Sequence, residues 1–154
     1  MRTIQADEVW KRAECVRELS DHHNRISVHF KGAFPSRPYE VTLKMFEDAL
    51  TDQTSRILAE EKDDRIIGFC KIDISGASGK LDYLVVLPEY RGQGLGKAFM
   101  EWAMSSFEEQ GVAEIEVKVI DGNDAVALYE KYGFRMHSHI MKKTDSDSCG
   151  SETV

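Results

Sequence analysis

The chain has 154 residues and a mass of 17.5 kDa, which suits one domain with a substantial buried core. Its net charge of -7 argues against a nucleic-acid-binding surface, and no apolar run approaches the ~20 residues that span a bilayer. Cys15, Cys70 and Cys149 are scattered and lack the paired spacing of a metal site. They are typical of free thiols in a reducing compartment, so we expect a cytoplasmic protein that binds no metal, nucleic acid or membrane.

The first fifty residues predict a short strand and two helices. Residues 3–5 favour a strand, and Asp7 suits the N-cap of a helix that reaches about His22. Residues 31–38 contain one glycine and two prolines, which predicts a loop, and a second helix is expected over residues 42–50. The buried stripe of the first helix is expected to consist of Val9, Trp10, Ala13, Val16 and Leu19.

From residue 56 the pattern changes to alternating strands, turns and helices. Strands are expected over residues 57–59, 65–72, 81–87, 115–119 and 134–141, with turns at 61–64 and 76–79. Helices are expected over residues 94–110, closed by Gly111, and 125–132, closed by Gly133. This order predicts a mixed α/β sheet with flanking helices. We expect a single domain over residues 1–143 and a disordered tail over residues 144–154.

The most informative segment runs from Leu87 to Lys97, with the sequence LPEYRGQGLGK. An apolar strand ends, Pro88 turns the chain, and alternate glycines open an amphipathic helix. Glycines let the backbone approach a ligand closely, and the first N–H groups of a helix have no internal partner. These donors lie at the positive end of the helix dipole and suit a phosphate or pyrophosphate, with Arg91 and Lys97 as cationic neighbours.

Two other phosphate motifs fail on spacing. A P-loop needs four residues between its first glycine and the Gly-Lys pair, but three separate Gly92 from Gly96. The dinucleotide fingerprint needs two residues between its last two glycines, but one separates Gly94 from Gly96. A purely structural glycine turn stays open as an alternative.

The segment resembles the Arg/Gln-x-x-Gly-x-Gly/Ala signature of the GNAT superfamily of acetyl-CoA-dependent N-acetyltransferases, with Arg91, Gly94 and Gly96 in the signature positions. Residues 125–134, AVALYEKYGF, are similar to the family's second signature, Ala-x-x-x-Tyr-Glu-Lys-x-Gly-Phe. Two signatures in the right order are more specific than either alone. The resemblance implies a GNAT-like α/β fold with a central, mostly antiparallel sheet whose strands splay apart.

For the donor, the resemblance implies acetyl-CoA bound between the splayed strands. In this family the strand before the glycine turn carries a bulge, and a bulge N–H polarises the acetyl carbonyl; Val86 is the expected donor of that N–H. The main chain expected beside the pantetheine and acetyl group belongs to Leu84, Val85 and Val86. The amides expected to hold the pyrophosphate belong to Gly92, Gln93, Gly94, Leu95, Gly96 and Lys97, and Arg91 is a further expected cofactor-binding residue.

One position departs from the family pattern. The family often places an asparagine seven residues before the tyrosine of the second signature, to contact pantetheine, but Gly122 stands there and Asn123 is one residue nearer. Two interpretations of Asn123 stay open, as a pantetheine contact or as the cap of the next helix.

The resemblance also implies two catalytic residues. An amine with a pKa of about 10 arrives protonated at neutral pH, and a carboxylate can remove that proton. Asp82 is our first candidate because acidic residues commonly occupy this place in family members; the alternative is an exposed strand residue. Tyr129 occupies the tyrosine position of the second signature and is expected to protonate the leaving thiolate, or else to pack beside the cofactor.

The expected reaction is acetyl transfer to a primary amine, on a small molecule, by direct attack in a ternary complex. The open alternatives are acetylation of a protein or peptide N-terminus, and a catalytically silent module that binds acyl-CoA. A homodimer is a further expectation. Acceptor-site candidates come from the first two helices and their connecting loop, namely His22, His23, His29, Phe34, Arg37 and Tyr39.

Overall fold

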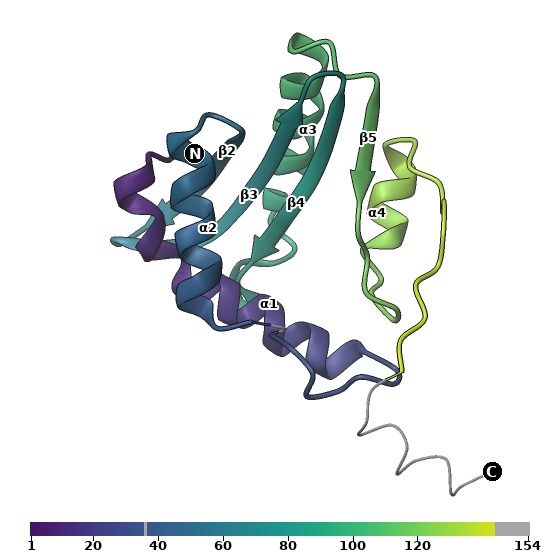
Figure 1. Ribbon diagram of the computed structural model, residues 1–154. Helices are drawn as coiled ribbons and strands as arrows, with labels where there is room; N and C mark the ends of the chain where they lie inside the picture. The colour runs from purple at the N-terminus through teal and green to yellow at the C-terminus, as the bar shows by residue number, and fades with distance from the viewer. Residues whose placement is uncertain (36, 144–154) are drawn as a thin grey trace, which may run out of the picture. The chain divides into compact units, whose positions relative to one another are not determined.

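A five-stranded sheet, with its strands in chain order, forms the centre of the first compact unit, Met1–Asn123. The computed structural model describes residues 1–35 and 37–143 of the chain. Strands β1 to β4 are antiparallel neighbours, and β5 runs parallel to β4 (Figure 1). The strands are β1 (Arg2–Thr3), β2 (Ser55–Lys62), β3 (Arg65–Ser75), β4 (Ser78–Val86) and β5 (Glu114–Val117). The predicted mixed, mostly antiparallel sheet is confirmed.

Helices cover the two faces of this sheet. Successive residues of a strand face opposite sides, and Phe69 packs edge-on against Phe46 while the neighbouring Gly68 lies under Phe99. One face is therefore covered by α1 and α2, and the other by α3 (Figure 1). The helix bounds are α1 (Ala13–Ile26), α2 (Tyr39–Thr51) and α3 (Leu95–Glu109), with 3-10 turns η1 (Ala6–Arg12) and η2 (Pro88–Tyr90). Both long helices predicted after residue 40 are confirmed.

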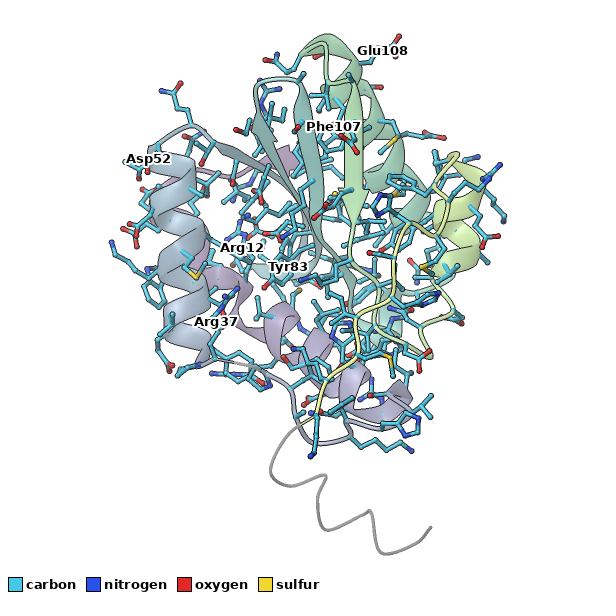
Figure 2. All side chains as sticks on the ribbon, turned by 45° about the vertical axis from the view of Figure 1, so that its right-hand side comes forward. Arg12, Arg37, Asp52, Tyr83, Phe107 and Glu108 are labelled. Carbon is cyan, nitrogen blue, oxygen red and sulfur yellow. The ribbon has the colours of Figure 1, made fainter. Side chains whose placement is uncertain are left out.

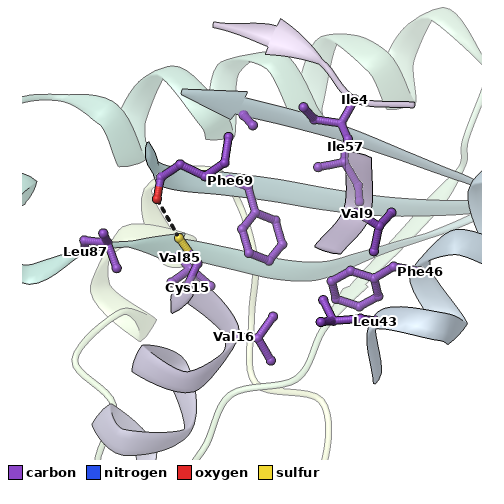
Figure 3. Packing of buried hydrophobic residues seen from close by; sticks show 12 residues of the cluster. Ile4, Val9, Cys15, Val16, Leu43, Phe46, Ile57, Phe69, Val85 and Leu87 are labelled. Carbon is purple, nitrogen blue, oxygen red and sulfur yellow. Dashed lines mark hydrogen bonds between the residues drawn. The ribbon is translucent and has the colours of Figure 1, made fainter. Parts of the chain in front are cut away.

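The core beneath α1 and α2 is apolar and closely packed. Phe46 and Phe69 meet at its centre, and the thiol of Cys15 donates to the Ile66 carbonyl over 3.4 Å (Figure 3). Burial raises the pKa of the Cys15 thiol to about 12 and also raises that of Cys70. Both thiols are therefore protonated, buried and inert, as the prediction of free cysteines requires. Cys149 lies outside the described residues.

The prediction for the first helix was partly wrong. Asp7 is not its N-cap: η1 begins at Ala6, and the Gln5 N–H donates to the Glu8 carboxylate over 3.1 Å. A 3-10 helix has three residues per turn, so Val9 and Arg12 share its buried face. Trp10, expected in the core, is 48% exposed.

The second unit, Asp124–Val154, contains the short helix α4 (Val126–Lys131). Gly133 follows it with a φ of 92°, as expected for a residue that ends a helix. The last predicted strand, residues 134–141, was wrong, since residues 134–143 are irregular. Alternating apolar residues form a strand only when another strand pairs with them, and none does so in the described chain. The predicted tail, residues 144–154, lies outside the described residues.

No helix among residues 1–35 and 37–143 combines the length and apolar character that crossing a bilayer requires.

Candidate active site

The second half of β4 has a free main-chain edge. Its parallel ladder with β5 covers Ser78–Leu81, and β4 continues to Val86 without a strand partner on that side in the described chain. On the other side, the Leu87 N–H donates to the Ile67 carbonyl of β3 over 2.9 Å. Because N–H groups alternate along a strand, those of Leu84 and Val86 point to the free edge. By the same alternation Val85 turns its main chain to β3, and its side chain is buried in the core.

A β-bulge lies in β4, but not where it was expected. Lys71 pairs with Tyr83 and the next β3 residue, Ile72, pairs with Leu81, so Asp82 is the extra residue. Val86, expected within the bulge, pairs regularly with Gly68. A bulge re-aims a side chain, and this one brings Asp82 and the neighbouring Tyr83 onto the same face, toward α2.

Asp82 is part of a buried ion-pair cluster on that face. The Lys71 ammonium, 5% exposed, lies 2.6 Å from the carboxylates of both Asp73 and Asp82. Lys80 lies 3.4 Å from the second oxygen of Asp82. The Lys71 ammonium also lies 5.1 Å from the centre of the Phe46 ring. Asp82 is therefore not a simple exposed strand residue, which was the alternative to a catalytic role.

These charged groups line a pocket of about 600 Å³ between α2 and the sheet. Arg37 and Tyr83 come together beside it (Figure 2), and the Tyr83 pKa is raised, first by burial and then by Asp82. The sequence analysis named Arg37 but missed Lys71 and Asp73. A charged lysine inside the apolar run 66–72 was the signal that could have found the cluster.

The glycine turn leads into the N-terminus of α3. Gly94 is the N-cap, with a φ of 85° that an L side chain rarely adopts. The first helical bond is from the Ala98 N–H to the Gly94 carbonyl, 3.1 Å. The N–H groups of Leu95, Gly96 and Lys97 precede it, and no backbone partner for them exists in the described chain.

The backbone of Gly96 is open to a ligand. Its backbone is ordinary helix, and an added Cβ would meet no atom within 4 Å. Neither conformation nor packing therefore requires glycine at this position. A ligand that approaches the backbone closely is a sufficient reason, because it would fill the space left above Gly96.

The two cations of the turn differ in how far they are engaged. The Arg91 Nε donates to the Val86 carbonyl over 2.9 Å, and its guanidinium lies 3.3 Å from the Glu18 carboxylate. Lys97 is 73% exposed and lies 3.9 Å from Glu101 one turn along α3. Arg91 thus contacts the end of the free β4 edge, while the Lys97 ammonium stays in solvent at the helix N-terminus.

Gly122 explains the departure from the expected asparagine position. Its φ is 91°, and an added Cβ would lie 2.3 Å from the Ile26 carbonyl oxygen at the end of α1. An asparagine cannot fit there in this backbone conformation. The alternative of Asn123 as the helix cap was wrong, because α4 begins after Ala125.

Tyr129 lies in α4 and is 9% exposed. Its ring packs edge-on against Phe134 at 6.0 Å, and its carbonyl accepts the Tyr132 and Phe134 N–H groups. The tyrosine of the second signature is thus held rigidly within its own unit.

A free strand edge beside a helix N-terminus with open space above it defines a class of proteins that bind a phosphate-bearing ligand along the main chain. The comparison with known families makes this specific. Residues 18–146 match the family model of the acetyltransferase (GNAT) domain, and the chain belongs to this family. The resemblance inferred from the two signatures is confirmed.

Curated relatives and solved structures agree with this assignment. The putative [ribosomal protein bS18]-alanine N-acetyltransferase of Bacillus subtilis (strain 168) is 28% identical over 58% of this chain and 60% of its own. The mycothiol acetyltransferase of Clavibacter sepedonicus is 32% identical over 57% of this chain and 29% of its own. The chain thus matches less than two thirds of the length of these relatives.

Among solved structures, the PaiA N-acetyltransferase of Thermoplasma acidophilum, crystallised with coenzyme A, shares this fold. Its TM-score is 0.72 at 19% identity, with 91% of this chain and 94% of that chain covered.

Proposed function

We propose that this protein transfers an acetyl group from acetyl-CoA to a primary amine on a small molecule, by direct attack within a ternary complex. The family membership supports acyl transfer, and the PaiA protein of the same fold was crystallised with coenzyme A. The observation that carries the proposal is the open backbone of Gly96 at the start of α3, beside the free edge of β4.

The donor binds through main-chain groups. The pyrophosphate accepts hydrogen bonds from the amides at the start of α3, where the helix dipole adds to the attraction. The pantetheine arm runs along the edge of β4 beside Leu84 and Val86, and Asn123 contributes a side-chain contact. The Val86 N–H donates to the acetyl oxygen and stabilises the negative charge that develops there.

The chemistry needs two proton transfers. The amine nitrogen attacks the thioester carbonyl carbon, so a C–N bond forms and the C–S bond breaks. Asp82, directly or through a water, takes the proton that the amine loses. Tyr129 gives its proton to the departing thiolate sulfur and regains one from solvent. The products are an amide and coenzyme A.

Calorimetry with acetyl-CoA on the wild type and Gly96→Leu tests the donor site. The signature admits alanine as well as glycine at this position, so the test needs a larger side chain. We expect Gly96→Leu to weaken binding at least ten-fold, because the isobutyl group fills the space above the backbone. Since leucine favours helix over glycine by up to about 1 kcal/mol, the same variant should be as stable as the wild type or more so.

The matched control is Gly76→Leu, in the β3–β4 turn. Gly76 also has open space around it, but its φ is 59°, so this variant should lose stability and keep full affinity. Equal affinity of Gly96→Leu and the wild type would overturn the proposed donor site. Binding without turnover of any amine would leave the chain as a silent acyl-CoA-binding module.

A second candidate acceptor is the N-terminal amine of a peptide. The name of the Bacillus subtilis relative, an alanine N-acetyltransferase of a ribosomal protein, favours it. An assay of coenzyme A release across small amines and alanine-starting peptides decides between the two acceptors.

A further inference from the structure

Charged side chains from four segments meet in the pocket between α2 and the sheet. Phe46, Met45 and Ala49 of α2 form its apolar wall. The charged groups lie on the loop before α2, on β3, on β4 and on β5. They are Arg37, Lys71, Asp73, Lys80, Asp82 and Glu116.

Four of these six groups neutralise one another. Lys71 bridges Asp73 and Asp82 at 2.6 Å each, and Lys80 reaches Asp82 at 3.4 Å. Two ammonium groups and two carboxylates sum to zero charge. The deepest charge, Lys71, is thus compensated and does not need a ligand.

The remaining two groups, Arg37 and Glu116, have no oppositely charged partner within 4 Å among the described side chains. The Arg37 Nε donates to the Thr42 hydroxyl over 3.1 Å, and its guanidinium faces the Tyr83 hydroxyl. Glu116 lies across from Lys80 in the β4–β5 register. The pocket therefore offers one unpaired cation from the loop before α2 and one unpaired anion from β5.

The anionic side of the pocket adjoins the expected reaction centre. The β4–β5 ladder ends at the Leu81–Val117 pair, and Asp82 is the next residue of β4. Glu116 precedes Val117 on β5. An amine placed beside Asp82 and Glu116 thus lies where the free edge of β4 begins.

We propose that the acceptor is a zwitterion, an amino acid or amino-acid derivative whose carboxylate binds Arg37 and whose amine lies beside Asp82 and Glu116. This inference rests on the proposed function and names the substrate class of its acceptor site. Arg37 presents a planar fork that suits a carboxylate. A diamine would place its second ammonium against Arg37, a like charge that disfavours it.

The test compares each L-amino acid with its own carboxamide and with putrescine, in a coenzyme A release assay. The carboxamide keeps the amine and the side chain but removes the negative charge. We expect kcat/KM for the best amino acid to exceed that of its carboxamide at least ten-fold. In Arg37→Gln this ratio should fall toward 1, and Arg56→Gln, at an exposed position on β2, should keep the wild-type ratio.

A second readout does not depend on turnover. Calorimetry measures the affinity of the same amino acid and carboxamide for the protein saturated with coenzyme A. A carboxylate preference that Arg37→Gln removes supports the zwitterion site even if no amine is acetylated, in which case the proposed function alone fails. Equal use and equal binding of acid and carboxamide, or a preference for putrescine, would overturn the inference.

Discussion

The proposed donor and acceptor regions of this protein offer a ligand different kinds of groups. At the glycine turn these groups are main-chain amides, and the side chains there are absent, exposed or engaged elsewhere, as Arg91 is by Val86 and Glu18. In the pocket under α2 they are charged side chains that meet from four segments. A site made of main-chain amides can be predicted from a short stretch of sequence, since glycines and a helix start mark it. A site made of side chains depends on the register of strands that are distant in sequence.

This difference accounts for where the sequence analysis succeeded. The glycines and the helix start predicted a phosphate-bearing ligand, the P-loop and dinucleotide spacings failed, and the family that the two signatures indicated is confirmed. The pocket was not foreseen, because nothing near Lys71 in sequence shows that β4 brings Asp82 to it. That meeting depends on a bulge, whose position the chain determines only after β3 and β4 have paired.

The largest expected effect is that of Tyr129→Phe, which removes a side-chain proton donor and tests whether Tyr129 acts as the general acid. If Tyr129 is the general acid, kcat should fall about 10²–10⁴-fold while the affinity for acetyl-CoA changes little. Steady-state kinetics and calorimetry measure the two quantities separately. Tyr132→Phe, three residues along the same segment, is the matched control, and an equal loss of kcat there would assign the effect to packing.

Gly122→Ala tests whether the main chain at residue 122 requires glycine. The added Cβ would lie 2.3 Å from the Ile26 carbonyl oxygen, and the residue also has a φ of 91°. We expect the free energy of unfolding to fall by about 3 kcal/mol or more, since strain and a backbone clash add together. Urea unfolding measures it.

Gly76→Ala provides the reference for this loss. Its φ is also positive, but no atom lies within 4 Å of the added Cβ. Its cost should be the conformational strain alone, about 1 kcal/mol. Equal costs at both positions would show that the chain beside Ile26 moves freely, and the explanation for the shifted asparagine would fail.

How far the sequence predicts the molecule can be judged from particular residues. The strands, α2, α3 and the glycine-ended α4 were predicted, because the spacing of apolar residues and the glycines that end helices can be recognised within a short stretch of sequence. The strand predicted over residues 134–141 is absent, because pairing with another strand depends on the tertiary fold and alternation alone does not secure it. Trp10 was placed inside and Arg12 was not considered, because a 3-10 turn in place of an α-helix rotates the buried face.

Lys71→Met tests the side-chain pocket. Lys71→Met removes the ammonium that Asp73 and Asp82 share, and Asp82 keeps only the longer contact with Lys80 at 3.4 Å. We expect a loss of about 2–3 kcal/mol in the free energy of unfolding, because the two carboxylates remain partly exposed. Lys97→Met, at the exposed start of α3, should change it by less than about 0.5 kcal/mol. If Lys71→Met loses no more stability than Lys97→Met does, water already solvates the ion-pair cluster.

The smallest expected effect concerns the loop that carries Arg37 to the pocket. His23, in the last turn of α1, packs edge-on against Phe34 of this loop at 5.3 Å, and burial lowers its pKa to about 4. The unfolded chain takes up a proton near pH 6.5, whereas the folded chain does so near pH 4. The contribution of neutral His23 to the free energy of unfolding should therefore be fully present above pH 6.5 and fall as the pH drops toward 4.

Because the ring is only partly buried, we expect this contribution to be about 1–2 kcal/mol. Urea unfolding at pH 7 and pH 4.5 measures how far the free energy of unfolding falls between the two pH values. His23→Phe should remove the histidine's part of this fall, and His29→Phe, at an exposed position, should retain it. If His23→Phe loses as much free energy of unfolding on acidification as the wild type does, the neutral His23 ring does not stabilise the loop. The pH dependence would then come from protonation of carboxylates.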